Sequence, residues 1–306
     1  MKMPTSLFRF SVAAALVFAL LPASAAQTTP KQFNFTVAPF DAIDDLHGSP
    51  LSADLVIFAA GNQFMVMPAL LKVFQASHPT VRRVFYETLP PGIEAKQIAA
   101  GSVEIGNLLT DVKPDVMLTG LRAMKQAKAQ GLVSHYVIYA SNQLAIEVAA
   151  GNPKDVHGLT DLGRDDVRVS MPNPRWEGVA AQIEVAYRKA GGEALSQKIM
   201  RTKLDAGTTL LTRIHHRETS LNIVAGKADA GPVWISEALY ARRIGSPIDF
   251  VEIPPGQNVT GNYVAAALVR APHAAAARAF VDFMASPTAA AIYRSYGFNP
   301  PQNKSG

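Results

Sequence analysis

Short apolar segments alternate with amphipathic segments along the body of the chain, and this alternation restricts the possible folds more than any other feature. The strand-like segments are residues 55–60, 81–86, 115–119, 167–170 and 231–234. The helix-like segments that follow them are residues 65–75, 92–100, 121–130, 178–189 and 236–242. Alternating strands and helices are typical of α/β domains with a mostly parallel sheet. The sequence therefore predicts an α/β fold.

Four further strand-like segments and one further helix complete the body of the chain. The strands are residues 137–139, 144–149, 250–253 and 263–269, and the helix is residues 216–225. The helix at residues 178–189 is expected to stop at Gly191 and Gly192, because glycine favours helix ends.

The last part of the chain, residues 280–298, predicts two short amphipathic helices. Phe280, Phe283 and Met284 recur at helical spacing before the break. Ser286 is placed to cap the second helix, with Pro287 at its first position. Gly297 is the expected helix stop.

The N-terminus predicts export. An apolar run over residues 10–21 follows a basic start and precedes small residues at the spacing that a signal peptidase needs. We expect residues 1–25 to be a signal peptide cleaved near Ala25, and residues 26–50 to be an N-terminal arm. No cysteine follows the cleavage site, so a lipid anchor on cysteine is excluded. The expected location is the periplasm.

Composition excludes several classes of function. The chain has no cysteine, which rules out disulfides, thiol chemistry and cysteine–zinc sites. Without residues 1–25, which hold Lys2 and Arg9 and no acidic residue, the formal net charge falls from +5 to +3. That positive bias is weak. The sequence has no basic run interleaved with aromatic residues, the pattern that would predict nucleic-acid binding. No nucleophile elbow, phosphate-binding loop or dinucleotide-binding glycine pattern is present. We therefore expect no enzyme activity, no cofactor and no metal.

Five collinear segments resemble the molybdate/tungstate-binding branch of the periplasmic solute-binding proteins of type 2. They are residues 55–60, 94–101, 114–119, 226–234 and the C-terminal stretch 280–298. The resemblance covers most of residues 52–300. It implies two α/β lobes, each a mostly parallel sheet flanked by helices, joined by two hinge crossings near residues 139–143 and 257–263.

The resemblance also implies a domain division and a function. Lobe 1 would comprise residues 51–140 and 260–303, and lobe 2 residues 141–259. The protein would be the substrate-binding component of an ABC importer, a monomer that binds a small oxyanion between the lobes and delivers it to a permease in the inner membrane. Closure of the lobes would depend on how strongly the ligand prefers the closed form.

In the first lobe, the family's first oxyanion-binding position matches Asn62, and the neighbouring Gln63 adds a second amide. A second family position lies in the loop at residues 87–92, where Thr88 offers a hydroxyl and Pro91 replaces the expected serine. Proline has no N–H to donate, so Pro91 is a departure from the molybdate pattern.

In the second lobe, the family positions match Glu177, His216 and Trp234, with Arg175 and Arg217 close by in the sequence. The tryptophan replaces a tyrosine hydroxyl and can donate only through its indole N–H. A carboxylate at position 177 would repel an oxyanion. Three explanations stay open: Glu177 points away and pairs with Arg175, it is protonated, or the ligand is not a bare oxyanion.

The expected ligand is a small oxyanion, molybdate or tungstate first. One alternative is a protein of the same fold that binds another solute, a metal or a small organic acid. A second is a periplasmic partner of a sensor. A hydrolase or transferase on the same fold is a further alternative.

Overall fold

The computed structural model describes residues 45–105 and 108–301. The predicted signal peptide and nearly all of the predicted N-terminal arm lie outside the described residues. Within the described part, strands and helices alternate as the sequence predicts. None of the helices described there is long and apolar enough to cross a membrane.

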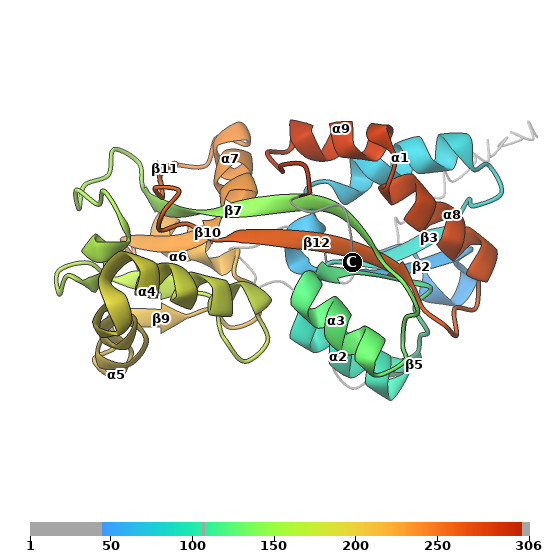
Figure 1. Ribbon diagram of the computed structural model, residues 1–306, viewed down its shortest axis with the longest axis horizontal. Coiled ribbons are helices and arrows are strands. Elements are labelled where there is room, and N and C mark those ends of the chain that lie inside the picture. The colour runs from blue at the N-terminus through green and yellow to red at the C-terminus, as the bar shows by residue number, and fades with distance from the viewer. Residues whose placement is uncertain (1–44, 106–107, 302–306) are drawn as a thin grey trace, which may run out of the picture. The chain divides into compact units, whose positions relative to one another are not determined.

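Most strands form one mixed sheet that has two halves (Figure 1). In the first half, β3 (Val84–Glu87), β2 (Leu55–Ala59) and β6 (Val116–Gly120) run parallel. The short β1 (Leu46–His47) pairs antiparallel with β3, and β12 (Thr260–Ala267) pairs antiparallel with β6. The parallel core agrees with the prediction, and the antiparallel strands lie beside it.

The second half is built in the same way. Its parallel strands are β10 (Ala230–Trp234), β8 (Val169–Met171) and β9 (Thr209–Leu211). Because parallel strands present their carboxyl ends at one edge, the turns that follow β8 and β10 lie near each other.

The long strand β7 (Val137–Ala149) belongs to both halves. Its residues 137–143 pair with β12, and its residues 144–149 pair with β10 on one side and with β11 (Ile248–Glu252) on the other. The chain returns to the first half between β11 and β12. Two crossings therefore link the halves, as predicted, whereas the exact domain boundaries stay a prediction.

The predicted break within this strand was wrong. Residues 137–139 and 144–149 belong to one strand, because Ser141 and Asn142 pair with β12 instead of forming a loop. Polar residues in the middle of a strand are stable here since their backbone groups complete the ladder.

Helices cover both faces of the sheet (Figure 1). The longer ones are α1 (Met67–Ser77), α2 (Pro91–Ala100), α3 (Leu121–Ala129), α4 (Gly178–Gln197), α7 (Ile235–Arg243), α8 (Ala274–Met284) and α9 (Pro287–Ser295). The shorter ones are α5 (Lys203–Asp205) and α6 (Glu218–Val224). The apolar face of α1 is buried, and the ring of Phe74 contacts that of Phe280 on α8 at 5.0 Å between centroids.

The C-terminal helix pair has the predicted signals. The Ser286 hydroxyl accepts a hydrogen bond from the Ala289 amide at 3.1 Å, and Pro287 begins α9. Gly297 follows the helix with φ of 84°, a left-handed conformation that glycine adopts without steric cost. These predictions are confirmed.

Other features escaped prediction. Gly191 and Gly192 interrupt α4 with non-helical dihedral angles, yet the helix resumes and continues to Gln197. The antiparallel pair of β4 (Ser102–Ile105) and β5 (Leu108–Asp111) and the three-residue β9 were also missed. These strands are short, so periodicity gives little signal for them.

The buried Asn258 side chain connects the two crossings. Its Oδ1 accepts from the Leu144 amide at 3.0 Å, and its Nδ2 donates to the Leu144 carbonyl at 2.9 Å. Leu144 is where β7 exchanges its pairing with β12 for pairing with β10 and β11. One side chain therefore holds both connecting segments.

Replacing Asn258→Ala should lower the free energy of unfolding by about 1–3 kcal/mol, because both backbone groups of Leu144 lose their partner in a buried setting. Urea denaturation measures the loss. The neighbouring Gln257→Ala serves as the control and should stay within about 0.5 kcal/mol of the parent. Equal effects from the two substitutions would contradict a connecting role for Asn258.

Candidate functional site

A cleft of about 1180 Å³ lies where the two sheet halves meet. Its walls come from α2 and α3 of the first half and from α4 of the second. Its inner end is formed by the turns after β2, β6 and β8, the last residue of β10 and the start of β12. Clefts of this kind at the carboxyl ends of parallel strands are frequent ligand sites.

Most of the predicted site residues line this cleft. Those that do are Asn62, Pro91, Arg175, Glu177, His216 and Trp234. Gln63, Thr88 and Arg217 are buried but do not line it. Segments far apart in the sequence therefore meet at one place, while ligand contact by each residue stays a prediction.

Glu177 and His216 bind each other at the inner end. The carboxylate of Glu177 accepts from the backbone amide of His216 at 2.8 Å, and its other oxygen lies 2.9 Å from His216 Nδ1. Both residues are less than 5% exposed. The first explanation that the sequence left open, that Glu177 points away and pairs with Arg175, was wrong: Glu177 lines the cleft and pairs with His216.

A second carboxylate lies on the other side of the same imidazole. His216 Nε2 is 2.9 Å from Glu237 Oε1, an ion-pair contact whose angle is poor for a hydrogen bond. Burial disfavours the imidazolium form, but the charges of Glu177 and Glu237 outweigh burial and raise the pKa of His216 well above its ordinary value. We therefore describe this as a positively charged ring between two carboxyl groups.

Asn62 is held from behind by a set of buried side chains. Its Nδ2 donates to the Tyr263 hydroxyl, and its Oδ1 accepts from Gln63 Nε2 at 3.1 Å. The Gln63 Oε1 in turn accepts from the hydroxyls of Tyr139, at 3.3 Å, and Tyr293, at 2.6 Å. Gln63 thus orients Asn62 from one layer behind the cleft wall.

Thr88 and Arg217 meet at a different buried group, Asp45. Arg217 forms an ion pair with the Asp45 carboxylate, His215 Nε2 lies 2.9 Å from it, and the Thr88 hydroxyl donates to it at 3.4 Å. Burial favours the neutral acid, but the contacts with His215 and Arg217 outweigh burial and lower the pKa of Asp45. This cluster ties the second half of the sheet to the first, beside the cleft.

Two glycines allow the halves to approach each other closely. The Gly92 amide, on α2, donates to the Trp176 carbonyl at 3.0 Å, and a Cβ on Gly92 would lie 2.7 Å from Trp176 Cα. A Cβ on Gly261 would lie 2.5 Å from the Trp234 ring. Real Cβ atoms do not approach other atoms so closely, so both positions require glycine in this arrangement.

Several cleft residues were not predicted from the sequence. Tyr263 and Trp176 line the cleft, and Glu237 lies directly behind His216. Glu237 is the third residue of α7, and a glutamate in the first helical turn is a recognisable capping signal. Arg175 lies on the rim, where its guanidinium sits 5.5 Å from the centroid of the Trp176 ring.

Within residues 45–105 and 108–301, no group of three or more histidine, aspartate or glutamate side chains is arranged to hold a metal ion. The donor set at the inner end of the cleft is one imidazole that is already engaged by two carboxylates.

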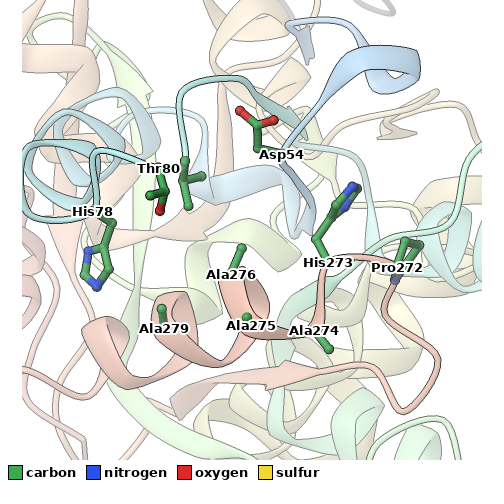
Figure 2. Close-up of a pocket in the computed structure, with 10 residues that line it drawn as sticks. Asp54, His78, Thr80, Pro272, His273, Ala274, Ala275, Ala276 and Ala279 are labelled. Carbon is green, nitrogen blue, oxygen red and sulfur yellow. The ribbon is translucent and has the colours of Figure 1, made fainter.

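A second, smaller hollow of about 490 Å³ lies beside the start of α8 (Figure 2). Small alanine side chains of α8 form its floor, and Asp54, His78 and His273 stand around it. Two of its polar side chains have protein partners: Asp54 pairs with Arg83, and His273 Nδ1 lies 2.9 Å from Asp115. None of the predicted site residues lies there, so the larger cleft is the candidate site.

Comparison with known proteins gives the family and several relatives of the chain. The family model described as "Bacterial extracellular solute-binding protein" matches residues 55–299. The molybdate-binding protein ModA of Mycobacterium tuberculosis is 28% identical over 255 residues, which is 81% of this chain and 85% of that protein.

Two solved structures show the same fold. The sulfate-binding protein SubI of Mycobacterium tuberculosis H37Rv has a TM-score of 0.67 at 21% identity and covers 80% of this chain and 85% of its own. The periplasmic molybdate-binding protein of Azotobacter vinelandii has a TM-score of 0.65 at 16% identity and covers 81% and 100%. The predicted two-lobed fold is confirmed. The first sheet half with its helices is hereafter lobe 1, and the second is lobe 2.

The buried carboxyl group of Glu147, close to His216 and Glu237, should make stability depend on pH. Burial raises the pKa of Glu147 from 4.5 to about 8, against the opposing hydrogen bond from Ser220. The folded protein keeps this group neutral where the unfolded chain ionises it. Stability should therefore fall as pH rises from 4.5 to 8, by on the order of a few kcal/mol.

Urea denaturation across this pH range tests the expectation. Glu147→Gln, which keeps a partner for Ser220, should remove much of the fall, whereas the exposed Glu252→Gln should leave the pH profile unchanged. The raised pKa of His216 adds stability below pH 6.5 that is lost at higher pH, so a residual slope of the same sign is expected. A variant profile as steep as the parent's would refute the assignment.

Proposed function

Because the chain belongs to the family of bacterial extracellular solute-binding proteins, we propose that it captures one small solute between its lobes for an ABC-type importer. It would act in the periplasm as a monomer, and its closed form would be read by a permease in the inner membrane. The solute would make contacts with both lobes and so favour closure. The protein would bind this solute without transforming it.

The orientation of three helices at the cleft supports an anionic solute. The first residues of α2, α3 and α4 all line the cleft: Pro91 and Gly92, Leu121, and Gly178. The start of a helix carries partial positive charge. In α3 and α4 it comes with first-turn amides, whereas in α2 Pro91 has no N–H and the Gly92 amide already donates to the Trp176 carbonyl. Helix N-termini from both lobes therefore direct positive electrostatic potential, which attracts an anion, at the same space. This is the observation that carries the proposal.

The class of solute that we propose is an oxyanion, with molybdate or tungstate first. The support is the sequence resemblance of Asn62, His216 and Trp234 to oxyanion-binding positions, and the names of relatives that bind molybdate or sulfate. A tetrahedral dianion can be held by neutral donors and helix ends without a full counter-charge.

Glu177 opposes a bare dianion in the observed arrangement. Its carboxylate already accepts a hydrogen bond from the His216 backbone amide and lies against the imidazole. It therefore takes the place that an external anion would need. An oxyanion that uses these donors must displace Glu177. We therefore expect Glu177 to weaken oxyanion binding.

Glu177→Gln should raise the affinity for molybdate by about tenfold or more, because the displaced group no longer carries a charge that repels the ligand. Isothermal titration calorimetry measures the change. Glu184→Gln is the matched control, since Glu184 also lines the cleft but pairs with Arg188 on α4. A tighter complex in the control alone, or weaker binding by Glu177→Gln, would contradict competition by Glu177.

The two tryptophans offer a direct test of the solute class. Both Trp176 and Trp234 line the cleft, and the chain has no others. Molybdate, tungstate, sulfate and phosphate should be titrated separately at constant ionic strength. At least one should change the intrinsic fluorescence saturably and raise the melting temperature, whereas chloride should do neither.

The pairing of Glu177 with His216 also favours a second candidate function. In it, a protein of this same fold binds a solute other than a bare oxyanion. Divalent cations and small carboxylic acids belong in the same titration. A saturable response to these with none to any oxyanion would replace the proposed solute class and leave the binding function intact.

A further inference from the structure

The part of the cleft between α2, α3 and α4, hereafter the outer cleft, reaches inward to Thr119 at the end of β6, which carries a polar group that the Glu177–His216 pair does not use. Thr119 is the fourth residue of β6 and is fully buried. Among the described residues, its hydroxyl has no hydrogen-bond partner, and the residue lines the cleft. A buried hydroxyl without a partner is costly, so its position next to a ligand cavity calls for a functional explanation.

The hydroxyl lies directly before the N-terminus of α3. Gly120 caps this helix and has no side chain that could accept from the first-turn amides. Thr119, Gly120, Leu121 and Arg122 line the cleft consecutively. A hydroxyl donor, open helix amides and a guanidinium are the groups that bind a phosphate or sulfonate oxygen.

The charges around this place favour an anion. Arg122 and Lys125 both line the cleft and are exposed, and neither pairs with a carboxylate in the part of the chain that the structure describes. The two carboxylates that line the cleft are engaged elsewhere, Glu177 with His216 and Glu184 with Arg188. The charge that remains for a ligand in the outer cleft is therefore positive.

The remaining walls are apolar and wide apart. Apolar residues of α2, β6, α3 and α4 line the outer cleft: Ala95, Ile98, Met117, Ala123, Val179 and Val185. On the lobe 2 side, Trp176 presents an indole whose Nε1 has no partner among the described residues. A cleft of about 1180 Å³ is as large as those that enclose whole organic ligands, and far larger than a tetrahedral ion needs.

We propose that the solute is an organic anion with a phosphate or sulfonate head group, whose head binds Thr119 and the N-terminus of α3 and whose apolar body lies between α2 and α4 against Trp176. This inference rests on the proposed function, because it specifies the oxyanion as part of a larger molecule. It also explains why Glu177 can stay on His216: the head group uses a different set of donors.

A matched pair of probes tests the proposal. Phenyl phosphate and inorganic phosphate share a head group and differ in the apolar body. Calorimetry on the full mature protein should show at least about tenfold tighter binding of phenyl phosphate, because the ring buries apolar surface in the outer cleft.

Thr119→Val then tests the place of the head group. This substitution keeps the side-chain shape and removes the hydroxyl, and it should weaken phenyl phosphate binding by about tenfold. Thr209→Val is the control, because Thr209 is equally buried, also has a hydroxyl without a partner among the described residues, and does not line the cleft. Arg122→Gln should likewise weaken binding, and the exposed Arg270→Gln should not.

The outcomes separate this inference from the proposed function. Binding of molybdate or phosphate at least as tight as that of phenyl phosphate, with no effect of Thr119→Val, would overturn the inference and leave oxyanion binding intact. Equal losses from Thr119→Val and Thr209→Val would also overturn it, since they would indicate a general loss of stability. Failure of every anion to bind would overturn both.

Discussion

The structure depends on a single pairing, that of β7 with β12 across the junction of the lobes. β7 contributes residues to both sheet halves, and β12 runs beside it from Thr260, at the place where the cleft ends. Because the two strands share a ladder, the carboxyl ends of β2 and β6 in lobe 1 face those of β8 and β10 in lobe 2. Asn62, Glu177 and Trp234 follow or end these strands, whereas Pro91 follows β3, His216 follows β9 and Tyr263 belongs to β12.

Within that frame, we propose that acidic side chains limit which solutes fit. This chain has a glutamate–histidine–glutamate set at the inner end of its cleft. A buried ion pair is retained only where its hydrogen bonds are satisfied, and Glu177 satisfies both donors of His216 that it reaches. The two His216 donors that Glu177 reaches are therefore engaged, whereas the Thr119 hydroxyl has no partner among the described residues. A ligand that uses Thr119 leaves the Glu177–His216 pair in place.

The sequence predicted the architecture better than the chemistry. Local signals such as the Ser286 cap, the Gly297 stop and the buried face of α1 act over a few residues, so they can be read directly from the chain. The continuity of β7 through Ser141 and Asn142 could not be read, because it depends on hydrogen bonds to a strand more than a hundred residues later.

The same limit applies to the site. The collinear resemblance predicted that Asn62, Glu177, His216 and Trp234 lie at one cleft. It could not show which of these side chains contact each other. The pairing of Glu177 with His216 depends on two loops that meet only in the folded chain, and the Asp45 cluster depends on the segment before β1. Thr119 escaped notice because a threonine at the end of a strand is common, and only its burial without a partner makes it informative.

Closure of the two lobes on a solute is the central claim, and a distance measurement across the cleft tests it most directly. The chain has no cysteine, so Ala99→Cys on α2 and Val185→Cys on α4, both exposed cleft residues on opposite walls, can each carry one spin label. Pulsed electron resonance should show a shorter and narrower distance distribution when molybdate or phenyl phosphate, whichever calorimetry shows to bind, is saturating. An unchanged distribution at saturation would contradict the account, because the solute would then bind without joining the lobes.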